Sequence, residues 1–253
     1  MAGRSARTSL LLLLFLLLSP SLHSLPASPT TVSDLYKYHP PPSSALSSSD
    51  SLLHSELSRL VPSALEHTGA ATFDEHLKGV QAVLRKWRAT EAVASAGLFH
   101  SIYGTEGFQG YKLPMGHRSE IREVAGERSE LLAWIFCVVD RHSVDLAVFG
   151  AERALRARPE LGRFEIAVSD EVFWELVELT LADWLEQVES ASTKPNSLFR
   201  WKVGEAFAYR RPAYAEMARV LAAREPRLAI AREMHEAVMA EEGVATRRLV
   251  QER

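Results

Sequence analysis

Two histidines and an aspartate stand at positions where metal ligands are common in helical proteins. His76 follows two carboxylates in a segment with apolar residues at helical spacing, and His100 ends an apolar segment of small residues. Asp140 closes the apolar run 131–139. Metal sites in helical proteins take imidazole and carboxylate ligands from facing helices. The order of these three side chains, two of them at the end of an apolar segment, therefore predicts a metal site.

The segment that follows His100 reads as a loop beside this site. Residues 101–116 contain four glycines and Pro114, which disfavour a helix. A loop of this length within a helical domain is often functional. Its polar side chains are therefore candidates for contact with a ligand.

The elements that must position these residues are predicted to be helices. Apolar residues recur at helical spacing along most of the chain, and Ala, Leu, Glu and Arg are abundant. Thr72 begins one helix, with Glu75 at capping-box spacing, and Thr90 begins the next. The expected helices span residues 51–60, 72–87, 90–100, 118–125, 127–140, 143–157, 170–191, 207–224 and 226–242.

Strand signals are scarce. Residues 164–168 alternate between apolar and other side chains and could form one strand, but a lone strand has no partner with which to pair. We therefore expect an all-α domain.

Composition excludes several classes of function. The formal net charge at pH 7 is −3 and no basic cluster interleaved with aromatic residues occurs, so nucleic acid is not an expected partner. Cys137 is the single cysteine, so no internal disulfide can form, and its apolar neighbours predict a buried, inert thiol. Gly-rich phosphate loops, nucleophile elbows and paired-cysteine zinc motifs do not occur.

The first residues are predicted to be a targeting segment. Arg4 and Arg7 precede the apolar run 10–18, and small residues follow, which is typical of a secretory signal peptide over residues 1–24. The apolar core is too short for a comfortable membrane span, so no stable span is expected after cleavage; an uncleaved anchor is the alternative. We expect a secreted protein or one of the secretory pathway. In an alga, the same segment would serve as the first half of a plastid-targeting presequence.

The rest of the chain divides into three parts. Residues 25–51 are rich in Pro and Ser and read as a flexible linker. Residues 52–225 are long enough for one domain that encloses a core with a pocket. Residues 226–253 read as a C-terminal helical extension.

Two resemblances to known families rest on these residues. In order, spacing and apolar context, the segment from His76 through His100 to Asp140 resembles the HD-domain superfamily, the all-helical metal-dependent phosphohydrolases. A closer resemblance, over about residues 55–225, is to an uncharacterised domain family of bacteria and algae that has no established activity. Its most specific part is the signature LFHSIYGTEGF. The matching segments are 67–69, 75–77, 98–108, 126–128, 136–141 and 183–187.

The HD resemblance implies an HD-like, multi-helix domain with a metal that activates water against a phosphate ester. HD proteins carry an aspartate directly after the second histidine, where this chain has Ser101. Because hard divalent cations favour anionic oxygen ligands, we expect one divalent ion here and not two. The expected ligands are His76, His100 and Asp140, with His67 or Glu106 as a substitute.

The resemblance also suggests roles for polar residues around the pocket. Glu106 is a candidate catalytic base, and Tyr103, Lys112 and Arg118 are candidates for binding a small phosphorylated molecule. Each has a structural interpretation as well, as a solvated or packed side chain. The segment 183–187 reads either as one wall of the pocket or as ordinary helix packing. Two other functions stay open: a non-catalytic ligand-binding or interaction domain, and a mononuclear iron oxygenase.

Overall fold

The computed structural model describes residues 46–62, 72–150, 154–193 and 210–240. Within these ranges almost all regular structure is helical, and the one sheet is a two-stranded hairpin. The expected all-α fold class is therefore confirmed. The expected signal peptide, most of the expected linker and His67 lie outside the described residues.

The first two helices begin close to where the sequence predicts. α2 (Ser48–Leu60) starts three residues before the expected position, after Ser47, whose hydroxyl accepts the backbone N–H of Asp50 at 3.0 Å. α3 (Phe73–Lys86) starts after Thr72, whose backbone N–H donates to the Glu75 carboxylate at 2.8 Å. The latter contact is the predicted capping box, which satisfies a backbone donor that the first helical turn leaves free.

α4 (Glu91–Phe99) lies at the centre of the N-terminal helices. It starts after Thr90, whose hydroxyl accepts the backbone N–H of Val93 at 3.3 Å. Residues 93–99 are all buried, because α3 and other helices pack around α4. Gly97 permits the close approach of α3, since a Cβ atom there would lie 2.6 Å from Cδ1 of Leu84. His100, which follows α4 directly, is thereby held inside the core.

Two further helices follow the glycine-rich loop. α5 (Arg118–Ala125) and α6 (Glu127–Val138) meet at Gly126, which has a φ of 89° that favours glycine. α6 packs on α4. It ends two residues earlier than expected, because Val139 leaves the helix and forms a β-bridge with Ala157.

The chain between α6 and α8 differs from the prediction. A helix is expected over 143–157, but α7 (Arg141–Val148) ends early and Gly150 follows with a φ of 75°. β1 (Leu155–Arg156) then pairs antiparallel with β2 (Glu165–Ile166). The alternation at 164–168 does mark a strand, and its partner lies within the segment that was expected to be helical.

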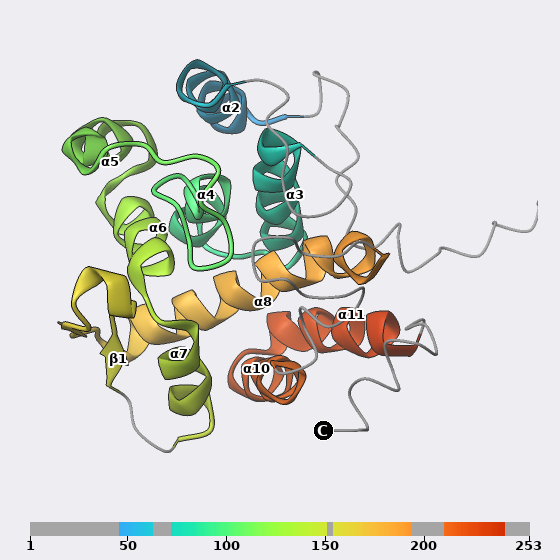
Figure 1. Ribbon diagram of the computed structural model, residues 1–253. Coiled ribbons are helices and arrows are strands. Elements are labelled where there is room, and N and C mark those ends of the chain that lie inside the picture. The colour runs from blue at the N-terminus through green and yellow to red at the C-terminus, as the bar shows by residue number, and fades with distance from the viewer. Residues whose placement is uncertain (1–45, 63–71, 151–153, 194–209, 241–253) are drawn as a thin grey trace, which may run out of the picture. The chain divides into compact units, whose positions relative to one another are not determined.

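α8 (Asp170–Thr193) connects the two halves of the fold. It packs against α3, α4 and α6 above and against α10 (Arg211–Arg224) and α11 (Ala229–Ala240) below, as seen in Figure 1. A 3-10 turn, Pro226–Leu228, joins α10 to α11. Leu228, Met234 and Val238 belong to the same buried cluster as Trp184, so residues 226–240 are part of the core. No helix in the described ranges combines the length and apolar character that a membrane span requires.

Candidate metal centre

The structure brings His76 and His100 together. His76 lies on the buried face of α3, and His100 follows the last residue of α4. Their side chains are almost fully enclosed, and their Nε2 atoms are 3.2 Å apart. Because α3 and α4 are consecutive helices that pack side by side, short-range sequence signals suffice to bring these two residues to one place.

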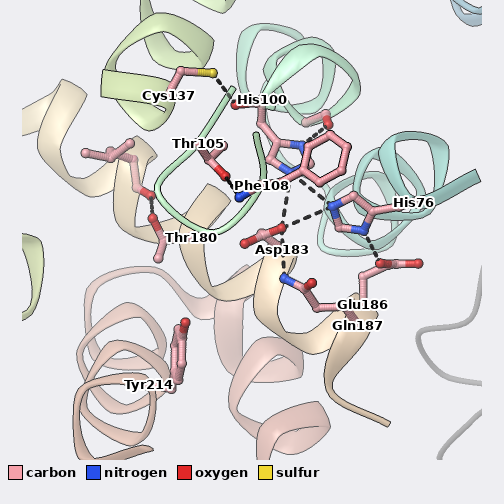
Figure 2. Close-up of polar contacts among 12 residues, drawn as sticks. His76, His100, Thr105, Phe108, Cys137, Thr180, Asp183, Glu186, Gln187 and Tyr214 are labelled. Atoms are coloured by element: carbon pink, nitrogen blue, oxygen red, sulfur yellow. Dashed lines mark hydrogen bonds and ion pairs between the residues drawn. The ribbon is translucent and has the colours of Figure 1, made fainter. Parts of the chain in front are cut away.

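Asp183 supplies a carboxylate to the same point from α8. Its Oδ1 atom lies 3.1 Å from Nε2 of His100 and 3.3 Å from Nε2 of His76. Figure 2 shows the three side chains converging from three different helices. Among the described residues, His76, His100 and Asp183 form a buried group that could hold a metal ion.

Outer hydrogen bonds fix the orientation of each of these side chains. Nδ1 of His100 donates to the backbone oxygen of Gly97 at 2.7 Å, and Nδ1 of His76 donates to the carboxylate of Glu186. The side-chain amide of Gln187 donates to Oδ1 of Asp183 at 3.2 Å. Metal-binding histidines characteristically donate one ring N–H to a carboxylate or carbonyl oxygen in this way, which directs the other nitrogen toward the ion.

The three inner atoms have the spacing of metal ligands. Bonds from zinc to nitrogen or oxygen are about 2.0–2.1 Å long, which separates two ligand atoms of a tetrahedral site by about 3.3–3.4 Å. The observed separations are 3.1, 3.2 and 3.3 Å. The three atoms therefore outline one face of a coordination polyhedron, with at least one position left for a further ligand.

In the metal-free protein, His76 carries a proton on each ring nitrogen and is therefore an imidazolium at neutral pH. Burial lowers the pKa of His76, but the carboxylates of Glu186 and Asp183 outweigh burial and raise it to about 10. Burial lowers the pKa of His100 and outweighs the opposing effect of Asp183. Burial also raises the pKa of Asp183, but hydrogen bonds from the two histidines hold it well below its usual range. An imidazolium, a neutral imidazole and a carboxylate thus share one buried site.

Asp140 lies elsewhere, although it was expected beside the histidines. It is the N-cap residue of α7, and its Oδ1 accepts the backbone N–H of His142 at 3.0 Å. Its own backbone N–H donates to Arg156 in β1 at 2.8 Å. The observed α6 ends at Val138, before Asp140, so this carboxylate caps the next helix and does not close the apolar one.

Two of the residues expected to bind substrate instead bind Glu130 of α6. The carboxylate of Glu130 is fully buried and accepts hydrogen bonds from the hydroxyl of Tyr103 at 3.2 Å and from Nε of Arg118 at 2.5 Å. Arg122, from α5, donates to the same carboxylate at 2.9 Å. These contacts join the loop, α5 and α6, so the structure gives Tyr103 and Arg118 structural partners.

The other expected site residues lie along the glycine-rich loop. Glu106 accepts the backbone N–H of Arg141 at 3.1 Å, which ties the loop to the start of α7. The side chain of Lys112 packs against Gly104, where a Cβ atom would lie 2.8 Å from the lysine Cγ. Ser101 is buried at the start of the loop. Neither Glu106 nor Lys112 belongs to the His76, His100 and Asp183 group.

Cys137 stabilises the end of α4 beside the site. Its thiol is buried and donates to the backbone oxygen of His100 at 3.0 Å. Burial raises the pKa of this thiol to about 12, so it stays protonated at neutral pH. The expected burial of the thiol is confirmed.

Asp183 was not among the expected metal ligands, although segment 183–187 was expected to form either a wall of the pocket or ordinary helix packing. The available signal was a carboxylate inside an apolar stretch of α8, with only 9% of Asp183 exposed. Glu186 and Gln187, one turn further on, face the same group of residues. A buried carboxylate requires a charged or hydrogen-bonding partner, and this requirement distinguishes Asp183 from the helix-capping Asp140.

Comparison with known proteins yields a match over one part of the chain. No curated protein and no solved structure matches this chain. One family model matches over residues 56–141, a range that includes His76, His100 and Asp140 but ends before Asp183. This match confirms the expectation of an uncharacterised family for that part of the chain: residues 56–141 match the family model described as Domain of unknown function (DUF6817).

Proposed function

We propose that the protein binds one divalent metal ion through His76, His100 and Asp183 and uses it to hydrolyse a phosphate ester of a small molecule. One observation carries the proposal. Two imidazole nitrogens and one carboxylate oxygen, from three helices, meet at separations of 3.1–3.3 Å within the core. Such a convergence of electron-pair donors is typical of a metal centre.

The hydrogen bonds around the three side chains support the same interpretation. The ring N–H groups of His76 and His100 point outward to Glu186 and Gly97, and both Nε2 atoms point inward. Gln187 donates to Asp183 and holds its carboxylate toward the histidines. This arrangement leaves the inner atoms oriented toward one cation.

The number of ligands supports a catalytic centre with a single ion. Structural zinc sites have four protein ligands, whereas catalytic sites have three and keep one position for water or substrate. Ser101 offers no carboxylate that could bridge two ions, and Glu186 is engaged by His76. When bound, such an ion supplies Lewis-acid activation of water toward a phosphate ester. The chain itself contributes ligands, their orientation and a largely water-excluded setting.

A second function is favoured by the identity of the ligands. Two histidines and one carboxylate on one face of the ion are also the ligand set of mononuclear iron oxygenases. The set alone is compatible with both chemistries, so metal identity is the discriminating measurement. A non-catalytic binding domain is the third interpretation, and it predicts metal or ligand uptake without turnover.

Elemental analysis of the purified protein, after exposure to zinc, manganese or ferrous iron, tests the site. We expect about one ion per chain in the wild type and none in His76→Ala or Asp183→Asn. His117→Ala is the matched control, because His117 lies on the surface and pairs with Glu120. A wild-type protein that stays metal-free under metal-replete conditions would refute both enzymatic functions.

Activity assays then separate the functions. We expect the zinc- or manganese-loaded protein to release phosphate from small phosphomonoesters, and Asp183→Asn to lose this activity. Uptake of iron alone, with oxygen consumption and no phosphate release, would favour the oxygenase. Stoichiometric metal without turnover on either class of substrate would leave the binding domain.

We further propose that residues 1–24 direct the protein into the secretory route or, in an alga, through it to the plastid. The basic start, the short apolar core and the small residues that follow support this proposal. N-terminal sequencing of the protein from its own cells is the test. A mature chain that still begins at Met1 would contradict it.

A further inference from the structure

Arg141 is a buried arginine whose guanidinium has no carboxylate contact within the part of the chain that the structure describes. Arg141 is 8% exposed, and its Nη1 atom has no hydrogen-bond partner among the described residues. Two other buried arginines lie within ion-pair distance of carboxylates: Arg158 of Glu160 and Arg210 of Asp145. Because a buried charge is costly unless it is compensated, the guanidinium of Arg141 requires an explanation.

Arg141 lies close to the proposed metal centre. Its Cζ atom is 3.7 Å from the centre of the Phe136 ring, in a cation–π contact. That ring meets the His100 ring edge to face, with 4.8 Å between their centres. The guanidinium is therefore at most about 8.5 Å from the His100 ring, with Phe136 as the shared neighbour.

Tyr214 of α10 connects Arg141 with Asp183. Its ring stacks on Trp184, the residue next to Asp183, at 4.4 Å. Burial raises the pKa of Tyr214, Arg210 and Arg141 oppose this, and Asp183 adds to it, so both Arg141 and Asp183 act on this hydroxyl. Figure 2 shows the hydroxyl end of Tyr214 directed toward the part of α8 that carries Thr180 and Asp183. Arg141 and Asp183 thus border the same region between α7, α8 and α10.

Of the two arginines that act on Tyr214, Arg210 is already paired, whereas Nη1 of Arg141 has no hydrogen-bond partner among the described residues. Arg210 forms two hydrogen bonds with Asp145, at 2.6 and 2.9 Å, and donates a third to the Tyr214 hydroxyl at 2.7 Å. Glu106 approaches Arg141, but its carboxylate accepts the backbone N–H.

We infer that Arg141 forms an oxyanion subsite beside the metal centre, which binds the terminal phosphoryl group of a phosphomonoester. This inference rests on the proposed function and specifies its substrate class. The unprotonated oxygens of such a group can ligate the ion and accept hydrogen bonds from the planar guanidinium at the same time. A metal–oxygen bond, the edge of the phosphate and a hydrogen bond together span about 7 Å, which is within the upper limit of about 8.5 Å on the distance between the His100 ring and the Arg141 guanidinium.

Binding of inorganic phosphate to the full chain tests this subsite. Titration calorimetry would compare the wild type with Arg141→Met, which removes the charge at similar length, and Arg141→Lys, which keeps the charge without the planar fork. Arg219→Met is the matched control, because Arg219 is exposed on α10 and pairs with Glu216. Elemental analysis of every sample separates a failure of the subsite from a failure of the metal site.

With one ion bound, we expect phosphate affinity to fall at least about tenfold in Arg141→Met, less in Arg141→Lys, and not in the control. Equal phosphate affinity in metal-loaded wild type and Arg141→Met would overturn the subsite and leave the metal proposal standing. Acetate that binds as tightly as phosphate, with the same dependence on Arg141, would overturn the phosphoryl assignment.

Two further outcomes are also decisive. If the wild type takes up no metal, the proposed function fails. Phosphate binding is then compared between metal-free wild type and metal-free Arg141→Met. Dependence of that binding on Arg141 would support the subsite, and its absence would overturn it. If Arg141→Met does not fold, as judged by thermal melting, the decision passes to Arg141→Lys. Unchanged phosphate affinity in this variant would then overturn the subsite.

Discussion

We expect metal affinity to rise about tenfold for each pH unit between pH 7 and pH 9, because the ion must displace the proton of His76. In the metal-free protein the pKa of His76 is about 10, so its imidazole is cationic across this range. His100 and Asp183 add no further proton, since the pKa of each is lowered from its ordinary value. Each ion that binds therefore releases one proton from the site.

The size of the effect follows from the distance between the pH and the pKa of His76. Each pH unit below that pKa corresponds to about 1.4 kcal/mol of competition by the proton. At pH 7 the metal therefore binds roughly a thousandfold more weakly than above pH 10, which is a difference of about 4 kcal/mol. A histidine with an ordinary pKa of about 6.5 would weaken binding less than about twofold at pH 7.

Titration calorimetry at pH 7, 8 and 9, in buffers with different ionisation enthalpies, measures the affinity and the protons released. Glu186→Gln removes the carboxylate that bonds to His76, so we expect it to lower the pKa of His76 and flatten the dependence on pH. Glu171→Gln, an exposed change at the start of the same helix, is the matched control. Affinity that is independent of pH, with no proton released, would refute this electrostatic reasoning even if the metal binds.

Four other changes have expected outcomes for stability. Glu130→Gln removes the buried charge that two arginines and a tyrosine share, and we expect it to lower the free energy of unfolding by about 1–3 kcal/mol in urea titrations. Asp140→Ala removes the N-cap of α7, and we expect a loss of about 1 kcal/mol with metal content unchanged by elemental analysis. Gly97→Ala forces a methyl group against α3, and we expect thermal melting to reveal a loss of about 1–3 kcal/mol. In the metal-free protein, the raised pKa of His76 contributes stability that is complete below about pH 6.5 and is lost as the pH rises toward 10; urea titrations of wild type and His76→Gln at both ends of this range measure it.

Local signals in the sequence predict those elements whose ends are determined by nearby residues. Thr72 with Glu75 and Thr90 with Val93 both make the cap contacts that their spacing indicates. Local signals could not predict the β1–β2 hairpin, because each strand depends on pairing with another segment of the chain. The composition of segment 143–157 favours a helix, but the backbone of β1 forms its hydrogen bonds with β2 and with Asp140. Tertiary pairing thus overrode local propensity.

Asp140 and Asp183 differ in the same way: nearby residues explain the position of Asp140, whereas distant residues explain that of Asp183. An aspartate at the end of an apolar run has a local use as a helix cap, and Asp140 has that use, so its position needs no metal to explain it. Asp183 lies inside an apolar run, where a carboxylate is costly without a compensating partner. That partner cannot be read from α8 alone, because both histidines lie on helices more than 80 residues earlier in the chain. For a buried site of this kind, a carboxylate that interrupts an apolar helix is therefore stronger evidence for a ligand than one that ends it.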